Sequence, residues 1–478
     1  MTIYSTHKYR EAASAAIGDQ NLQKALSGFQ HRMGPATAEM YRQLPEGTGL
    51  RDRAHAIRML GIENLDILLE TLAENVRKNG GEVFFAGTAE EAVNYCLDLA
   101  RRQGVKRVVK GKSMVTEEIG LNSALEREGI AVHETDLGEY IIQLAGEKPS
   151  HIIAPAIHKT RDQIGRLFTG KLGIDYTNDP PTLTRAARKA LREKFLQAEM
   201  GVTGCNLACA ETGHITTVSN EGNIRMSSTL PRIHVAFMGM ERVVACLEDH
   251  DILFRLLSRG AAAQKLGGYV SYVGGPGGEH FPDGPREFHL VVIDNGRNRI
   301  LADPAFREIL CCIRCSACLN VCPVYGKIGG HAYGSPYSGP VGSVVTPLLI
   351  GPQHAKDLCL GESLCGACKD ACPINIDLPR MLRELRYRIA EGDAAWGILS
   401  TSSGERLTFG IWALLTRHPV FYQLALHLGA MAQSVLPRNN GFIRHIPGPM
   451  GAWTRSRDLR RINKKPFRER FTDKRSTQ

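Results

Sequence analysis

The sequence lacks the features that mark a secreted or membrane-spanning protein. Residues 1–10 contain no apolar run that would serve as the hydrophobic region of a signal peptide. No stretch of 18 uncharged apolar residues occurs; the nearest approach, Leu407–Leu436, contains Arg417 and is interrupted by Pro419. We therefore expect a cytoplasmic protein in which this stretch forms two docking helices, and peripheral contact at the inner face of the membrane is left open.

Aromatic residues and uniform charge are also scarce. Only 6% of the 478 residues are aromatic, and the contents of hydrophobic (43%) and charged (23%) residues are those of a soluble globular protein, which excludes a disordered chain. Of the net charge of +10, the segment Arg455–Gln478 supplies 10 − 3 = +7. This distribution disfavours a nucleic-acid-binding surface and predicts a basic C-terminal arm.

No convincing nucleotide-binding fingerprint or flavin site is present. The glycine-rich run Gly274–Gly278 is interrupted by Pro276, and no helical pattern follows it. A phosphate-binding loop is expected to lead into a helix, so we interpret this run as a surface loop.

Helical and strand patterns alternate between Ile62 and Lys159, which predicts a mostly parallel sheet in an α/β domain. The expected strands are residues 82–86, 105–109, 130–133 and 151–155. Shorter strands are expected from Gly201 onward, with a hairpin whose turn is Asn220–Asn223. Further expected elements are a strand at 288–293, a helix beginning at Asp303 and a helix at 378–391.

Cysteine is abundant: thirteen are present, and nine lie between Cys311 and Cys372. Without an export signal, such a cluster indicates metal ligands in a reducing compartment. The first run has the spacing C-x2-C-x2-C-x3-C-P and consists of Cys312, Cys315, Cys318, Cys322 and Pro323. In bacterial ferredoxins the first three thiolates of such a run bind one [4Fe–4S] cluster, and the fourth binds the other.

A second run repeats part of this spacing with Cys365, Cys368, Cys372 and Pro373. Two runs predict two [4Fe–4S] clusters that exchange their fourth ligands. Structural zinc is the alternative, because it also uses pairs of C-x2-C. We disfavour zinc because seven cysteines lie in two ferredoxin-type runs that each end in proline.

The second run is incomplete, since Glu362 stands where a full run has a cysteine. The second cluster therefore has Cys322, Cys365 and Cys368 and lacks a fourth ligand. Cys359 is a candidate for it; a buried thiol there, or a cluster completed by a partner or a non-cysteine group, is the alternative. The other cysteines are expected to be a thiol beside the ligands, Cys311, and the core thiols Cys96, Cys205, Cys209 and Cys246.

The spacer between the two runs, Val324–Leu358, contains three tyrosines, seven glycines and four prolines. This composition predicts a long loop without a core of its own that lies over the clusters.

Several stretches resemble the LutB family, the iron–sulfur subunit of bacterial lactate utilisation. They are the two cysteine runs and the segments Lys110–Glu118, Gly201–Gly213, Asn220–Asn223 and Pro447–Arg457. The order of the parts matches the family over nearly the whole chain, and Cys205, Cys209 and Cys359 are departures from its pattern.

The resemblance implies a NagB/RpiA-like α/β LUD domain, a dicluster ferredoxin domain and a helical C-terminal region. We expect a helical lead-in at 1–60 and these three parts at 61–300, 301–392 and 393–478. The resemblance assigns Cys312, Cys315, Cys318 and Cys372 to one cluster, and Cys322, Cys365 and Cys368 to the other. It also implies oxidation of L-lactate to pyruvate together with LutA-like and LutC-like sister subunits.

Two functions remain open at this point. Iron–sulfur clusters relay single electrons, and no hydride acceptor is identified, so the first hypothesis is an electron-transfer subunit and not a self-sufficient enzyme. The second is that the LUD domain itself acts on a small anionic substrate through Lys110, Lys112, Glu211 or Glu221, each of which also fits a plain structural role. A redox-sensing regulator has little support, because no DNA-reading motif accompanies the basic tail.

Overall fold

The computed structural model describes residues 4–47, 49–278, 283–399, 403–433, 436, 441–455, 457–463, 465, 467 and 470–471. It divides into two units, residues 1–399 and 400–478, and each is described by itself.

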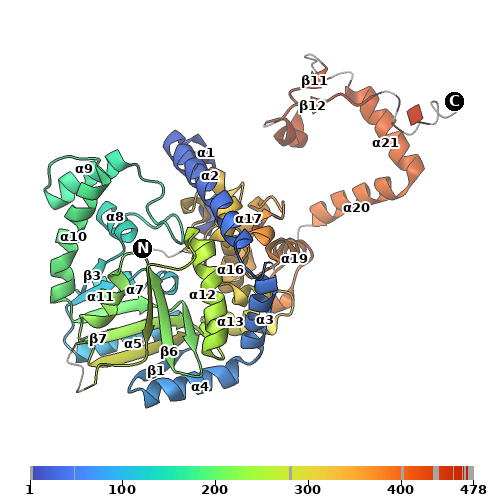
Figure 1. Ribbon diagram of the computed structural model, residues 1–478. Helices are drawn as coiled ribbons and strands as arrows, with labels where there is room; N and C mark the ends of the chain where they lie inside the picture. The colour runs from blue at the N-terminus through green and yellow to red at the C-terminus, as the bar shows by residue number, and fades with distance from the viewer. Residues whose placement is uncertain are drawn as a thin grey trace. The chain divides into compact units, whose positions relative to one another are not determined.

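A six-stranded sheet forms the centre of the first unit (Figure 1). All of its neighbouring strands pair in parallel, which confirms the α/β class expected from the alternating pattern. In spatial order the strands are β1 (Glu82–Ala86), β10 (Glu287–Ile293), β7 (Ile233–Gly239), β4 (Met200–Gly204), β2 (Arg107–Lys110) and β3 (Ala131–Glu134). The strands β7 and β10 are buried along almost their whole length because both faces of the sheet are covered.

Helices connect these strands, and their ends follow local signals. The Thr88 side chain accepts a hydrogen bond from the Glu91 N–H at 3.2 Å, so a capping residue starts α5 (Ala89–Arg102). The others are α4 (Leu65–Lys78), α6 (Met114–Glu118), α7 (Leu121–Arg127), α8 (Leu137–Ala145), α9 (Arg161–Leu172), α10 (Pro180–Gln197), α11 (Asn223–Thr229), α12 (Leu247–Ala262) and α13 (Arg297–Ala302).

The strand order reverses beside β2. The chain passes from β2 to β3 on one side and returns with β4 on the other side of β2. In open α/β sheets such a reversal leaves a crevice at the carboxyl ends of the strands. A second sheet of four short strands has the order β8 (Val243–Val244), β5 (Leu207–Cys209), β6 (His214–Ser219) and β9 (Tyr269–Val273).

Two local expectations are wrong. Residues 151–155 form no strand, and residues 224–228, expected as the second strand of a hairpin, lie in helix α11. Gly222 has a φ of +72°, and the Asn223 side chain accepts a hydrogen bond from Ser219 at 2.7 Å, so the chain turns into a helix instead of folding back. Strand β6 instead pairs with the preceding strand β5 and with the distant strand β9.

Four N-terminal helices pack around the cysteine-rich region. They are η1 (Thr6–Lys8), α1 (Tyr9–Gly18), α2 (Gln20–Arg42) and α3 (Gly49–Glu63). Gln30 on α2 donates to the carbonyl oxygens of Leu319 and Cys322, and His55 on α3 lies 2.9 Å from that of Ile374. The N-terminal segment is therefore part of the support for the cysteine runs.

The region that carries the cysteines is helical and deeply buried. Its elements are η3 (Arg307–Cys311), α14 (Ala317–Val321), α15 (Tyr325–Ile328), η4 (His331–Tyr333), α16 (Gly339–Ile350), α17 (Pro352–Gly361), α18 (Ala367–Asp370), α19 (Leu378–Glu391) and η5 (Ala394–Trp396). Helix α19 has the expected bounds. The helix expected from Asp303 begins only at Arg307, as a 3₁₀ turn, and the Asp303 carboxylate accepts the Ala305 N–H and also binds Arg388 and Trp396.

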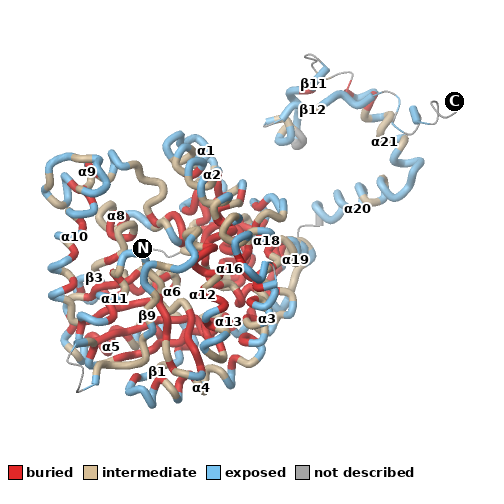
Figure 2. The backbone as a smooth tube through the Cα atoms, viewed as in Figure 1, coloured by how far each residue is buried: buried red, intermediate tan, exposed pale blue. Residues whose placement is uncertain are grey.

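The prediction that the spacer is a loop without a core of its own is wrong. The spacer contains α15, α16 and most of α17, and the buried residues of the first unit gather in this region as well as in the sheet (Figure 2). Tyr325, Tyr333 and Tyr337 are among its largest fully buried side chains. The glycines permit close packing: a Cβ at Gly342 would lie 2.2 Å from the Tyr337 carbonyl oxygen.

The second unit contains α20 (Ser403–Arg417), α21 (Pro419–Ala432), β11 (Phe442–Ile443), η7 (Gly448–Thr454) and β12 (Leu459–Arg460). The break at Pro419 confirms two helices where the sequence has its longest apolar stretch. Within the described residues no helix is both long and apolar enough to cross a bilayer. Much of the basic tail, including Lys464, Arg468, Lys474 and Arg475, lies outside the described residues.

Candidate metal centre and adjoining cavity

The two cysteine runs lie side by side, because helix α14 of the first run packs against α18 of the second. Three non-glycine residues beside the cysteines have left-handed backbone: Arg314 (φ +58°), Ser316 (φ +61°) and Leu364 (φ +56°). Each such residue costs about 1 kcal/mol or more, and this kind of strain is concentrated at functional sites. Such strained backbone is expected where loops wrap around a bound group.

Four cysteines form a first group. Burial raises the pKa of the Cys315 thiol, and the charges of Cys372 and Cys312 raise it further. Burial also raises the pKa of Cys318, and the charges of Cys312, Cys315, Cys368 of the second run and Cys372 raise it further. Burial also raises the pKa of Cys372 to about 12. The four thiols that the resemblance assigns to one cluster are therefore electrostatic neighbours, and three of them, Cys315, Cys318 and Cys372, are buried, whereas Cys312 is partly exposed.

Backbone N–H groups point at three of the cysteine sulfurs. Arg314 N donates to Cys312 Sγ, Tyr325 N to Cys322 Sγ and Ile376 N to Cys372 Sγ, each at 3.4 Å. Hydrogen bonds to the sulfurs are a main way in which proteins tune iron–sulfur clusters. These donors, together with buried soft thiol ligands, fit such a cluster.

The second group contains a carboxylate. Glu362 is only 6% exposed, and its Oε2 accepts a hydrogen bond from Cys322 Sγ at 3.5 Å. The hydroxyls of Ser343 and Tyr333 donate to Oε1 at 2.9 and 3.2 Å. The Glu362 charge is also, after burial, the largest contribution that raises the pKa of Cys368, followed by that of Cys365.

Cys359 lies apart from this group. Its thiol donates to the Lys356 carbonyl oxygen at 3.1 Å, and the nearby side-chain charges that shift its pKa are Arg386 and Asp357. Burial raises this pKa to about 11. The structure thus brings Glu362, and not the Cys359 thiol, into contact with Cys322.

Of the remaining cysteines, Cys311 lies nearest to the first group, because burial and then, among other charges, those of Cys312 and Cys372 raise its pKa to about 12. The Cys311 thiol lies 3.4 Å from Met59 Sδ. Cys96 and Cys209 are buried, whereas Cys205 and Cys246 are partly exposed. Among the described residues, no three His, Cys, Asp or Glu side chains meet closely enough to hold one metal ion. The fit to a cluster rests on burial, grouping and N–H donors.

The four candidate catalytic residues of the LUD domain do not all lie at one site. Lys110 is fully buried and pairs with Glu134 at 2.6 Å, and the Glu211 carboxylate accepts the Leu247 N–H at the start of α12. Lys112 and Glu221 line a cavity of about 310 Å³. Burial and, next, the Asp136 charge raise the pKa of Glu221 to about 7.

The roles of two features of this region were not predicted from the sequence. One is Glu362, although its position in place of a cysteine was a usable signal. The other is the pair Arg242 and Arg314, which lie far apart in sequence and line the same cavity. No local pattern reports such a pairing, because it depends on how the two regions pack.

Family models match three parts of the chain: a LUD domain at residues 69–293, a 4Fe-4S dicluster domain at 308–376 and the C-terminal domain of lactate utilisation protein B at 399–476. The dicluster match supports the binding of iron–sulfur clusters by the cysteine runs.

Proteins named Lactate utilization protein B are similar over nearly the full length. The one from Bacillus licheniformis is 44% identical over 471 residues, which cover 98% of this chain and 97% of the relative. The one from Bacillus velezensis is 43% identical with the same coverage. Among solved structures, a DUF162 family protein from Deinococcus radiodurans shows 14% identity and a TM-score of 0.28, covering 48% of this chain and 98% of that one.

Proposed function

This chain belongs to the lactate utilization protein B family, and from that membership we propose that it is the iron–sulfur electron-transfer subunit of a complex that oxidises L-lactate to pyruvate. The observation that carries the proposal is the pair of adjacent, mostly buried cysteine runs with N–H donors to their sulfurs. A bound [4Fe–4S] cluster supplies one-electron transfer, whereas lactate gives up two electrons. Sister subunits of the LutA-like and LutC-like kinds are proposed to supply the acceptor for lactate.

We propose two clusters. Cys312, Cys315, Cys318 and Cys372 hold the first, and Cys322, Cys365 and Cys368 hold three corners of the second. Thiols bind iron as thiolates, so the raised pKa of the buried cysteines means that cluster assembly must release protons. Arg51 donates to the Cys372 carbonyl oxygen at 3.0 Å and adds positive charge beside the first cluster.

The test is anaerobic reduction by L-lactate. In the co-purified complex, L-lactate is expected to produce the EPR signals of reduced clusters in this subunit. The isolated chain should show no reduction and no lactate turnover. Clusters that stay oxidised in a complex that turns over lactate would contradict the electron-transfer role.

A second function is favoured by the cavity. Glu221, with a pKa of about 7, and Lys112 both line it, and a carboxyl group with such a pKa suits general acid–base catalysis. Under this alternative the LUD domain is itself catalytic on a small anionic substrate. Turnover by the purified chain without any sister subunit would favour it.

The fourth ligand of the second cluster gives a direct prediction. We propose Glu362, since its Oε2 faces Cys322 while Oε1 is fixed by two hydroxyls. Glu362→Gln should convert the second cluster to a form with fewer irons and change its EPR spectrum, with the first cluster intact. Carboxylate and amide have nearly the same volume, so the variant removes the anionic ligand and little packing.

Cys359→Ser is the matched control. If Glu362 completes the cluster, the iron content and EPR spectrum of Cys359→Ser should equal those of the wild type. The reverse result, a changed second cluster in Cys359→Ser and none in Glu362→Gln, would assign the position to Cys359, as the sequence first suggested.

We also propose that the C-terminal unit docks the chain onto a sister subunit. Helices α20 and α21 expose many large apolar side chains, among them Phe409 (62%), Trp412 (62%) and Val420 (73%). The basic tail is proposed to add attraction to anionic surfaces, worth about 1 kcal/mol per basic residue near an anionic bilayer and screened by salt.

Truncation after Gly451 separates the two contributions. Pull-down of sister subunits should persist at low and physiological salt, because the helices remain. Flotation with anionic vesicles, if the tail drives it, should weaken in the truncated chain and, in the full chain, at the higher salt. A truncated chain that matches the full one in both assays would deny the tail any docking role.

A further inference from the structure

The cavity lies where a parallel sheet is expected to bind a ligand. Its wall includes Lys112 and Ser113 just after β2, Gly204 at the end of β4 and Gly239 at the end of β7. These strands flank the reversal of strand order. Open α/β sheets bind ligands at this place, outside the carboxyl ends of the strands.

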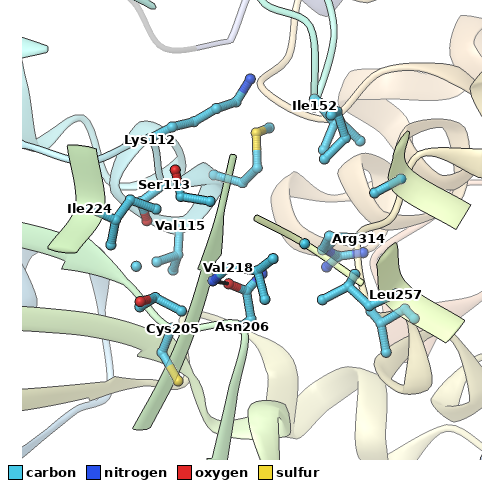
Figure 3. A pocket seen from close by; sticks show the side chains of 18 of the residues that line it. Lys112, Ser113, Val115, Ile152, Cys205, Asn206, Val218, Ile224, Leu257 and Arg314 are labelled. Atoms are coloured by element: carbon cyan, nitrogen blue, oxygen red, sulfur yellow. Dashed lines mark hydrogen bonds between the residues drawn. The ribbon is translucent and has the colours of Figure 1, made fainter. Parts of the chain in front are cut away.

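Two arginines line this cavity, and Arg314 lies across it from the residues that follow β2. Figure 3 shows Arg314 and Leu257 across the space from Ser113 and Ile224. Arg314 belongs to the loop between Cys312 and Cys315, and Arg242 follows β7. Both side chains are 10% exposed. The cavity therefore lies between the LUD sheet and the loop of the first cysteine group.

The positive charge here is not fully neutralised. Glu241 is 2.8 Å from Arg297 but 3.7 Å from Arg242 and 4.0 Å from Arg314. Glu118 also pairs with Arg297 at 2.8 Å. After burial and Glu241, the neighbouring Arg314 charge is the next influence on the pKa of Arg242, and it lowers that pKa. The buried guanidinium groups of Arg242 and Arg314 thus share the carboxylate of Glu241, which is bound more closely by Arg297.

One hydrogen-bond donor of Arg314 has no partner among the described residues. Arg314 Nη1 is buried and has no hydrogen-bond partner, although its guanidinium stacks over the Tyr337 ring at 4.7 Å. An unpaired buried donor of a charged group is costly, and a carboxylate is the ligand whose two oxygens match a guanidinium. The same cavity is lined by the apolar side chains of Ile152, Val218, Leu257 and Ile313.

We propose that this cavity binds a small monocarboxylate of the 2-hydroxy or 2-oxo acid class, with its carboxylate held by Arg242 and Arg314. The apolar wall would receive the short carbon chain. The choice of this acid class rests on the proposed function, whereas the carboxylate site itself rests on the two arginines. Arg314 lies between Cys312 and Cys315, and its backbone N–H donates to Cys312 Sγ, so the bound acid would lie next to the first cluster.

The test is calorimetric titration of the anaerobically prepared full chain with L-lactate, pyruvate and uncharged L-lactamide. L-lactate or pyruvate should bind, and L-lactamide should bind at least about tenfold more weakly, because it cannot form a charge-assisted pair. Arg314→Gln and Arg242→Gln should each weaken binding of the acids by about tenfold or more. Iron content and circular dichroism show that each variant is folded.

Arg51→Gln is the matched control. It removes a positive charge beside Cys372 from outside the cavity, so acid binding should stay within about twofold of the wild type. If Arg51→Gln weakens acid binding as much as the other two variants, Arg242 and Arg314 act only by balancing the negative charge of the cysteine group and do not bind the acid directly.

Equal binding of L-lactate and L-lactamide, or no binding of either acid, would overturn the proposal. If Arg314→Gln loses its iron, Arg242→Gln gives the same comparison from outside the cysteine loop, and the acid–amide comparison needs no variant. Reduction of the clusters by L-lactate in the complex is a separate measurement. Failure of the acids to bind would therefore not affect the electron-transfer proposal. Failure of L-lactate to reduce the clusters would likewise not affect the proposal that the cavity binds a carboxylate.

Discussion

Anaerobically purified chain is expected to contain about eight iron and eight acid-labile sulfide ions, and Cys318→Ser is expected to lower both to about four. Cys318 is the best position for this test, because it is 9% exposed and senses the charges of Cys312, Cys315 and Cys372. Loss of a central ligand removes a covalent iron–sulfur bond that a buried serine replaces poorly.

Cys311→Ser is the control for this prediction. Cys311 is adjacent to a proposed ligand and as deeply buried, yet its thiol lies against Met59 Sδ. The Cys311→Ser protein should therefore retain all of its iron and sulfide. Stoichiometric zinc without sulfide in the wild type would instead establish the structural-zinc alternative, and a full complement of iron in Cys318→Ser would remove Cys318 from the ligand set.

The sequence allowed prediction of features that depend on near neighbours. The cysteine spacing, the strand Glu82–Ala86 and the helix Leu378–Glu391 are set by a few consecutive residues and their caps. The capping Asp377 accepts the Arg380 N–H, which is a signal readable within four residues. Where propensity and position agree over such short distances, pattern reasoning is sufficient.

The errors arise where distant contacts decide. The spacer Val324–Leu358 has the composition of a loop, but its glycines allow helix α16 to approach neighbouring backbone closely and become buried. Likewise, Asn220–Asn223 has the composition of a hairpin turn, yet β6 finds its partners in β5 and β9. Tertiary packing overrides local preference in both segments.

The same reason hides Glu362 and the role of the N-terminal helices. A glutamate in a cysteine motif looks like a defect until Ser343 and Tyr333 are seen to hold its carboxylate. From the sequence, helix α3 is only part of a helical lead-in. In the structure its side chains bind backbone carbonyl oxygens of both the LUD region and the cysteine region. The Glu362 contacts span 19 and 29 positions and those of α3 with Cys372 and Ile374 span 321 and 319, and neither set leaves a periodic trace.

Arg58 on α3 is the clearest case of such a contact. Its guanidinium is fully buried and donates to the carbonyl oxygens of Val243 (3.0 Å) and Glu241 in the LUD region. It also donates to those of Leu310 (3.0 Å) and Cys311 (3.3 Å) in the segment that enters the first cysteine run. One side chain thus satisfies four backbone acceptors and ties the two regions together.

Arg58→Met should therefore destabilise the protein strongly. It fills a similar space but leaves up to four buried carbonyl oxygens without donors, each costing about 1–3 kcal/mol, partly offset because no charge is buried any longer. We expect a net loss of about 3 kcal/mol or more, measured in the anaerobic holoprotein by urea unfolding followed by circular dichroism and iron release. Arg53→Met is the control on the same helix: the Arg53 side chain is 55% exposed and forms a surface ion pair with Glu248, so its loss should cost no more than about 1 kcal/mol. Equal unfolding midpoints for the two variants would show that Arg58 does not hold the LUD sheet and the cysteine region together.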